Sequence, residues 1–222
     1  MAKSSIIKEL ANSSIDTATA LKRLKILLSG INKVEIHDWV NNELIGYENA
    51  DKLPPYRRFN GQLKGNFIIG NSICMMKYIN TPLPLVALPD EERLLIEEVT
   101  FTEGIAAIRE MIGQPIGKAI PPEIYSYIKK GTNITSILSA QVEIPQSAPM
   151  EIITAVESKI LDILLLLEKE FGNLDDLDID CTSKSDDEID EVCQKIVNII
   201  FLNDKSISIG DNNKFSKLEI ST

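Results

Sequence analysis

A single long helix is predicted over residues 147–171, whose sequence is SAPMEIITAVESKILDILLLLEKEF. Apolar side chains recur at helical spacing along one face of this segment, and three further leucines widen that face. Gly172 follows directly and supplies a helix stop. Because an apolar surface this broad needs cover on nearly all sides, we expect the helix to run through the centre of the protein.

The chain before residue 50 is predicted to form a helical hairpin. Asp16 is placed to cap a first helix, in which leucines recur at helical spacing among basic residues until Gly30. A second helix is expected from residue 32 to a stop at Gly46. A shorter helix around residues 6–10 should precede the pair.

The middle of the chain, from residue 51, is predicted to mix strands, loops and short helices. The Pro54-Pro55 pair excludes helix, and residues 57–77 carry three glycines among β-forming side chains. Residues 81–89 hold three prolines and should be extended. The predicted fold class is therefore α+β, predominantly α-helical with a small central β region. Short helices are expected at 90–96, 102–112 and 121–131, and a strand at 136–144.

The last fifty residues differ from the rest in charge and in the pattern of apolar residues. Nine acidic residues against one lysine within 173–191 predict a solvated linker at 173–187, which would separate a body (1–172) from a C-terminal region (188–222). That region starts with an amphipathic helix to residue 202 and ends in two alternating segments around a Gly-Asp-Asn-Asn turn, typical of a short β-hairpin or β-arch. A unit this small needs a partner to be stable. We therefore expect copies to assemble through six apolar residues: Ile196, Ile200, Ile207, Ile209, Leu218 and Ile220.

Composition excludes several classes of protein. The chain has 222 residues, 44% of them hydrophobic, and a formal net charge of −10, which together exclude disorder of the whole chain. No apolar run is long enough for a membrane span or a secretory signal, so we expect a cytoplasmic protein without a membrane partner. Basic and acidic side chains balance in residues 1–150, so the acidic excess lies in the last third. Nucleic-acid binding would therefore need a local basic patch.

Residues suited to catalysis or metal binding are few. His37 is the single histidine, and the acidic side chains beside it favour an exposed histidine on a helix surface. Cys74 and Cys193 lie in apolar sequence and are expected to be packed, unreactive thiols. Residues 176–187 imitate a calcium-binding EF-hand loop but lack its turn glycine and its final glutamate. We therefore expect neither a metal ion nor a cofactor.

One segment has a composition suited to an anion. Residues 61–65, Gly-Gln-Leu-Lys-Gly, are glycine-spaced and basic, and with Arg57 and Arg58 upstream they could hold a phosphate or a nucleotide through Lys64. The alternative, which we favour, is a β-turn region with ordinary surface cations. The same patch would be extended by three residues of the first helix: Lys22, Arg23 and Lys25.

A run that begins at Trp39 has a distinctive order. A Trp-x-x-x-Glu-Leu-x-Gly-Tyr helix end is followed by Leu-Pro-x-Tyr-Arg at residues 53–57 and by glycines at 61 and 65. This run resembles the signature of the AbiTii family of bacterial abortive-infection proteins, and the resemblance extends less specifically over about residues 1–172. It implies anti-phage defence, in which an infected cell halts growth or dies before phage is released. It implies no established reaction.

The signature has two interpretations. In the first, its polar side chains are structural, and Tyr47, Tyr56 and Arg57 tie the loop that follows the helix to Glu43. In the second, these four residues and Lys64 form a site for a ligand or a protein partner.

Three functions agree with these features. We favour a non-catalytic sensor or interaction protein of anti-phage defence that self-assembles through its C-terminal region, where Ile-x-Ile-Gly-Asp-Asn-Asn resembles pieces of other bacterial defence proteins. Its expected partners are further copies of the chain and a phage component or a partner protein of the defence system. One alternative is a growth-arresting toxin enzyme, such as a nuclease, that uses Glu43, Arg57 or His37. The other is a nucleotide-signal receptor that uses Arg57 and Lys64.

Overall fold

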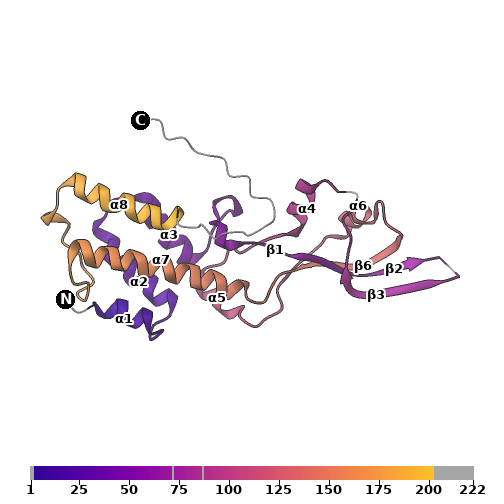
Figure 1. The fold of residues 1–222 in the computed structure, drawn as a ribbon, viewed down its shortest axis with the longest axis horizontal. Coiled ribbons are helices and arrows are strands. Elements are labelled where there is room, and N and C mark those ends of the chain that lie inside the picture. The colour runs from indigo at the N-terminus through magenta and orange to yellow at the C-terminus, as the bar shows by residue number, and fades with distance from the viewer. Residues whose placement is uncertain (1–2, 72, 87, 203–222) are drawn as a thin grey trace.

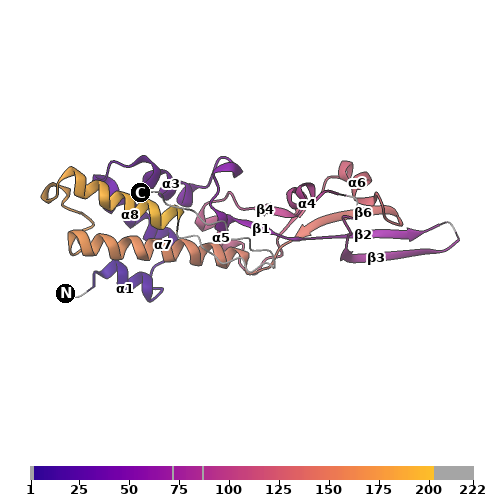
Figure 2. The same ribbon diagram turned by 45° about the horizontal axis from the view of Figure 1, so that its top comes forward.

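The computed structural model describes residues 3–71, 73–86 and 88–202. The molecule is elongated, with most of its helices gathered in one half and a β-sheet extending from the other (Figure 1). Turning the molecule shows the same two halves along the long axis (Figure 2). The mixed α+β class predicted from the sequence is confirmed.

The helical half is built around α7 (Ala148–Phe171), which matches the long helix predicted from residues 147–171. Seven of its apolar residues between Ile152 and Leu167 are buried, and three leucines that widen this face are partly buried: Leu161, Leu165 and Leu166. The neighbouring helices pack on α7 or on one another: α1 (Ser5–Ala11), α2 (Thr17–Leu27), α3 (Val34–Ile45), α5 (Ile105–Glu110) and α8 (Asp186–Phe201). Figure 1 shows them gathered around α7. The α2–α3 pair is the predicted hairpin, and Asp16 caps α2 by accepting from the Thr19 amide at 2.6 Å.

In the sheet half, the described residues form an antiparallel sheet of four strands in the order β3-β2-β6-β5. Phe67 of β2 lies opposite Tyr78 of β3 and Ile137 of β6, and the Phe67 and Tyr78 rings stack with centroids 5.0 Å apart. Two short helices, α4 (Asp90–Glu97) and α6 (Tyr125–Lys129), lie on one side of this sheet (Figures 1 and 2). The strands are β2 (Gln62–Gly70), β3 (Met75–Pro82), β5 (Gly117–Ala119) and β6 (Ile134–Glu143).

A second, two-stranded sheet connects the halves. It pairs β1 (Arg58–Asn60) with β4 (Glu98–Thr100), and Phe59 and Phe101 meet edge to face beside it with centroids 5.6 Å apart. Because β1 runs almost directly into β2, the chain passes from the helical half into the large sheet at this point.

The acidic segment before α8 differs from the predicted linker. Leu174 and Ile179 are buried in the core, so the segment folds against the helical half instead of lying free in water. The reason is that apolar residues interrupt the acidic run at intervals and anchor it. Ser185 then opens α8 with a capping box completed by Glu188.

The predicted C-terminal helix is present as α8, and its apolar face is occupied within the chain. Ile196 and Ile200 are buried where α8 packs against α7 and α3. No helix in the described ranges combines the length and apolar character needed to cross a membrane.

Candidate functional site

The polar residues of the signature converge on one buried carboxylate, Glu43, in the last turn of α3. Its Oε1 accepts from the Tyr47 hydroxyl at 2.7 Å and from the Tyr56 hydroxyl at 2.6 Å. Arg57 donates from Nη2 to Oε2 at 2.7 Å and from Nε to Oε1 at 3.2 Å. The side chains of Glu43 and Arg57 are both 0% exposed. We call Glu43, Tyr47, Tyr56 and Arg57 the Glu43 cluster.

The backbone places these side chains together. Gly46 ends α3 at φ +112°, a left-handed conformation that favours glycine, and the chain turns so that the Tyr47 amide donates to the Thr102 carbonyl at 2.7 Å. The prolines before Tyr56 allow only a short 3₁₀ turn, Pro55–Arg57. That turn points Tyr56 and Arg57 back at the end of α3. The tie between Glu43 and the following loop, predicted as the structural interpretation of the signature, is confirmed.

Arg57 also fastens the segment that follows β4. Its Nη1 donates to the carbonyl oxygens of Phe101 at 3.1 Å and Glu103 at 2.7 Å. Its guanidinium lies over the Tyr47 ring, 5.0 Å from the ring centroid. A buried guanidinium is stable only when nearly all its donors are used, and here they are used within the chain.

The electrostatics of the cluster follow from burial around one carboxylate. Burial, reinforced by the charge of Glu43, raises the pKa of the Tyr47 and Tyr56 hydroxyls well above the ordinary value for tyrosine. Burial alone would lower the pKa of Arg57, but the hydrogen bonds and charge of Glu43 outweigh it and raise that pKa. Both tyrosines therefore stay neutral donors and Arg57 stays charged across the physiological pH range.

Further contacts link the Glu43 cluster, through Tyr56 and Lys159, to the C-terminal end of α8. Trp39 Nε1 donates to the Tyr56 hydroxyl at 3.0 Å. Lys159 of α7 lies with Nζ 5.4 Å from the Tyr56 ring centroid and donates to the carbonyls of Ile199 at 3.0 Å and Ile200 at 2.9 Å. Sequence spacing gives no sign of this link, because Lys159 is a lone basic residue on an otherwise apolar helix face.

A surface pocket of about 330 Å³ adjoins the cluster. Trp39, Tyr47 and Pro54 form its apolar wall, and Phe201 closes one side. The charged groups at its lining are Lys52 and two acids of α3. Tyr47 is the one member of the Glu43 cluster that lines this pocket, and its hydroxyl is engaged with Glu43.

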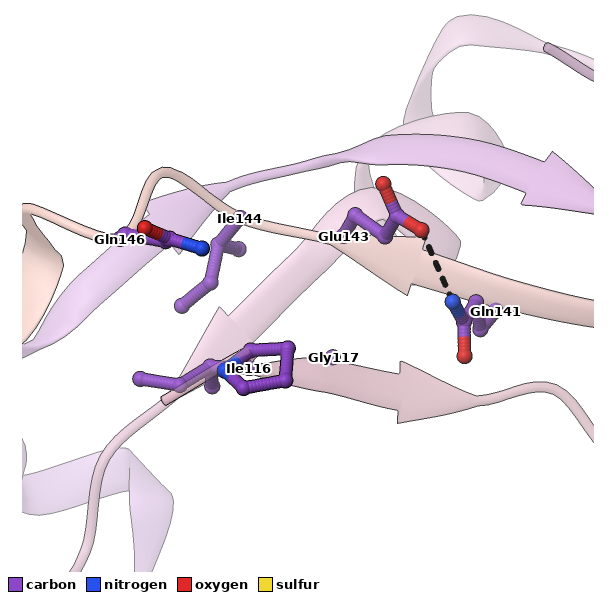
Figure 3. A pocket seen from close by; sticks show the side chains of 7 residues that line it. Ile116, Gly117, Gln141, Glu143, Ile144 and Gln146 are labelled. Carbon is purple, nitrogen blue, oxygen red and sulfur yellow. Dashed lines mark hydrogen bonds between the residues drawn. The ribbon is translucent and has the colours of Figure 1, made fainter. Parts of the chain in front are cut away.

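Lys64 lies apart from this cluster, in the large sheet. It donates to Glu143 Oε2 at 2.8 Å, and that hydrogen bond is the main reason why the pKa of Glu143 lies below the ordinary value. Figure 3 shows Glu143 beside Gln141, which donates to it at 2.8 Å, at the edge of a pocket of about 280 Å³ lined also by Ile116 and Ile144.

The phosphate patch, the less favoured of the two interpretations of residues 57–65, does not form in the described part of the chain. Arg57 is enclosed by protein, Lys64 is paired in the sheet, and Arg58 pairs with Glu98 at 3.3 Å. A side chain at Gly65 would clash with the Ser139 carbonyl and with Leu83. The glycine spacing therefore allows strands to pack closely and does not form an anion-binding loop.

The remaining candidate residues are separate from one another. His37 is half-buried, with Nε2 2.6 Å from the Ile31 carbonyl. Cys193 is buried as predicted, and burial raises the pKa of its thiol. The expectation that Cys74 is packed is wrong: it is exposed, because it lies in the turn between β2 and β3. In the described part of the chain, histidine, cysteine and acidic residues form no group of three or more that could hold a metal ion.

The predicted assembly residues divide into two sets. Ile196 and Ile200 belong to the core of the helical half, so they are not available on the surface of the folded chain. The other four lie outside the described residues: Ile207, Ile209, Leu218 and Ile220.

Fold and site together define an α+β protein in which a buried, internally satisfied polar cluster ties the end of α3 to the segments that flank the two-stranded sheet. The family model described as AbiTii matches residues 4–192. The chain therefore belongs to the AbiTii family, and this membership implies abortive-infection defence against phage. Neither the curated proteins nor the solved structures contain a match to the chain.

Proposed function

We propose that this protein acts in abortive infection as a non-catalytic interaction protein that assembles with copies of itself through the residues after α8. The observation that carries the non-catalytic part of the proposal is the burial of the Glu43 cluster. Glu43 and Arg57 are both 0% exposed. Glu43 accepts from Arg57 and from two tyrosine hydroxyls, and Arg57 donates to Glu43 and to two backbone carbonyls. Side chains enclosed in this way hold the fold together and do not contact a substrate.

Burial of α8 narrows the region proposed for assembly. Because Ile196 and Ile200 pack inside the helical half, the apolar residues proposed to join copies are the four that follow residue 202. They alternate with polar residues and carry no proline among them, which suits pairing between strands of different chains.

The alternative functions have less support from the same geometry. A toxin enzyme acting through Glu43 or Arg57 would need both to reach a substrate, and a nucleotide receptor would need Arg57 and Lys64 on one surface. Arg57 is enclosed by protein, and Lys64 pairs with Glu143 in the large sheet.

The test replaces four apolar residues in the full chain: Ile207, Ile209, Leu218 and Ile220, each to Ser. We call this the serine-tail variant. Mass photometry of the parent should show assemblies heavier than the 24.7 kDa chain, and the serine-tail variant should fall to the mass of one chain. A matched control changes four polar tail residues to Ser, namely Asn203, Asn212, Asn213 and Thr222, and should assemble like the parent.

Two results would reject the proposal. One is a parent that is a single chain at cellular concentration, and the other is a serine-tail variant that assembles like the parent. A nucleotide that raises the melting temperature of the protein would favour the receptor instead.

A further inference from the structure

Among the described strands, β3 forms an open edge of the large sheet. The opposite edge is covered. Strand β5 pairs with one end of β6, and α6 contacts β6. The Tyr125 hydroxyl accepts a hydrogen bond from the Ala140 amide at 3.1 Å. β3 pairs only with β2 among the described strands. An open edge of this kind leaves backbone N–H and C=O groups ready to pair with another chain.

Strand β3 exposes large apolar side chains to solvent, including Met75 and Ile79. Tyr78 stacks on Phe67, so Lys77 and, by the same alternation, Met75 point to the other side of the sheet. Ile79 lies at the irregularity opposite Asn66 and lines a surface pocket together with Asn66 and Ser139. Ile79 is 68% exposed and Met75 66% exposed. Strand β3 contains one lysine and no acidic residue.

Residues 203–222 have the composition of a strand that fits this edge. They contain three lysines against three acidic residues, so the segment is neutral although the whole chain carries −10. Ile207 and Ile209 alternate with serines, and Leu218 and Ile220 repeat the pattern. A strand with one apolar side would continue the backbone ladder of β3 and cover its exposed apolar side chains.

The end of α8 and β3 lie in different halves of the molecule (Figures 1 and 2). The last turn of α8 is held in the helical half by the hydrogen bonds from Lys159 to Ile199 and Ile200. A segment reaching β3 of its own chain would use many residues to run along the molecule, whereas β3 of another copy requires no such path.

We propose that residues 203–222 of one copy add a strand to β3 of another copy. This inference rests on the proposed function, because it names the surface that receives the assembling segment. The two surfaces differ, so the contact is head to tail and produces rings or open chains instead of closed two-fold dimers alone.

Lysine substitutions at exposed positions of β3 test whether this strand is the surface that receives the tail. Met75→Lys together with Ile79→Lys adds charge to the edge without removing core side chains, since both residues are mostly exposed. This variant should lose assembly and fall to one chain mass, with its melting temperature unchanged. The control is Ile45→Lys, which changes an 80% exposed isoleucine of α3 and should assemble like the parent.

Mixing distinguishes pairing between copies from pairing within one. The serine-tail variant keeps an open β3, and the Met75→Lys, Ile79→Lys variant keeps the native tail. Each should be a single chain alone, and an equimolar mixture should form pairs of twice 24.7 kDa.

Each other outcome has a definite meaning. A mixture that stays at one chain mass, or a β3 variant that assembles like the parent, overturns the inference, and in the second case assembly through the tail still stands. Assembly that persists in the serine-tail variant rejects the proposed function itself.

Discussion

Arg57 is the residue on which the signature depends most. Arg57→Met would leave the Glu43 carboxylate buried without its cation, and breaking a buried ion pair costs about 3–5 kcal/mol of folding free energy. Urea unfolding should report that loss. The neighbouring Arg58→Met removes a partly exposed pair with Glu98 and should cost about 1 kcal/mol or less. Equal, small losses for the two variants would contradict the structural role of the Glu43 cluster.

Glu168 makes folding depend on acid pH. The hydrogen bond from Lys3, aided by those from the amide and hydroxyl of Ser4, lowers the pKa of Glu168 to about 2 from the ordinary 4.5. The folded state therefore binds this proton less readily than the unfolded chain. The resulting stabilisation is present above pH 4.5 and disappears as the pH falls towards 2.

The melting temperature of Glu168→Gln should therefore fall less than that of the parent between pH 4.5 and pH 2. Thermal melts across that range measure it, and Glu151→Gln, an exposed substitution on the same helix, serves as the control. Parallel pH profiles for the parent and Glu168→Gln would show that the contact between Glu168 and the N-terminal segment does not persist in solution.

At the scale of elements, Lys159 links two helices. It supplies donors to the last carbonyls of α8, where the helix has no further amides of its own to satisfy them. Lys159→Met should therefore loosen the last turn of α8, and hydrogen exchange of residues 199–202 should become several-fold faster while the first turns stay unchanged. Lys169→Met, an exposed change on α7, should leave that exchange unaltered. Uniform acceleration across α8 would contradict a local tie.

The elements themselves could largely be predicted from the sequence. The α7 helix, the α2–α3 hairpin and strand β6 follow from periodicity and from glycine stops, which act locally. The placement of α8 could not be predicted, because an apolar face looks the same in sequence whether it meets its own chain or another. The burial of Leu174 and Ile179 could not be predicted either, because acidic residues surround them in sequence and their burial depends on contacts with the helical half.

The candidate site was only half predictable for a related reason. The spacing of Glu43, Tyr47, Tyr56 and Arg57 indicated a tie between helix and loop, and the structure confirms it. The same arginine also suited a phosphate site, and sequence does not report which side of the chain it faces. Lys159 and the carbonyls of Phe101 and Glu103 complete the network through contacts between residues far apart in sequence.

At the scale of the whole molecule, the two halves have different properties. The helical half is closed around α7, and the polar residues of its signature are used internally. The sheet half has an edge strand, β3, that pairs only with β2 among the described strands and exposes apolar side chains. This contrast supports an account in which the protein acts through contact with other chains and the Glu43 cluster holds the end of α3 to the segments beside the two-stranded sheet.

The most direct test of that account is phage protection measured by plaque counts in cells that express the serine-tail variant at the parent's level. We expect the variant to remain folded and to lose protection, while the control with four polar tail residues changed to Ser protects like the parent. Full protection by a serine-tail variant that is a single chain would contradict the account, because the protein would then act without assembling.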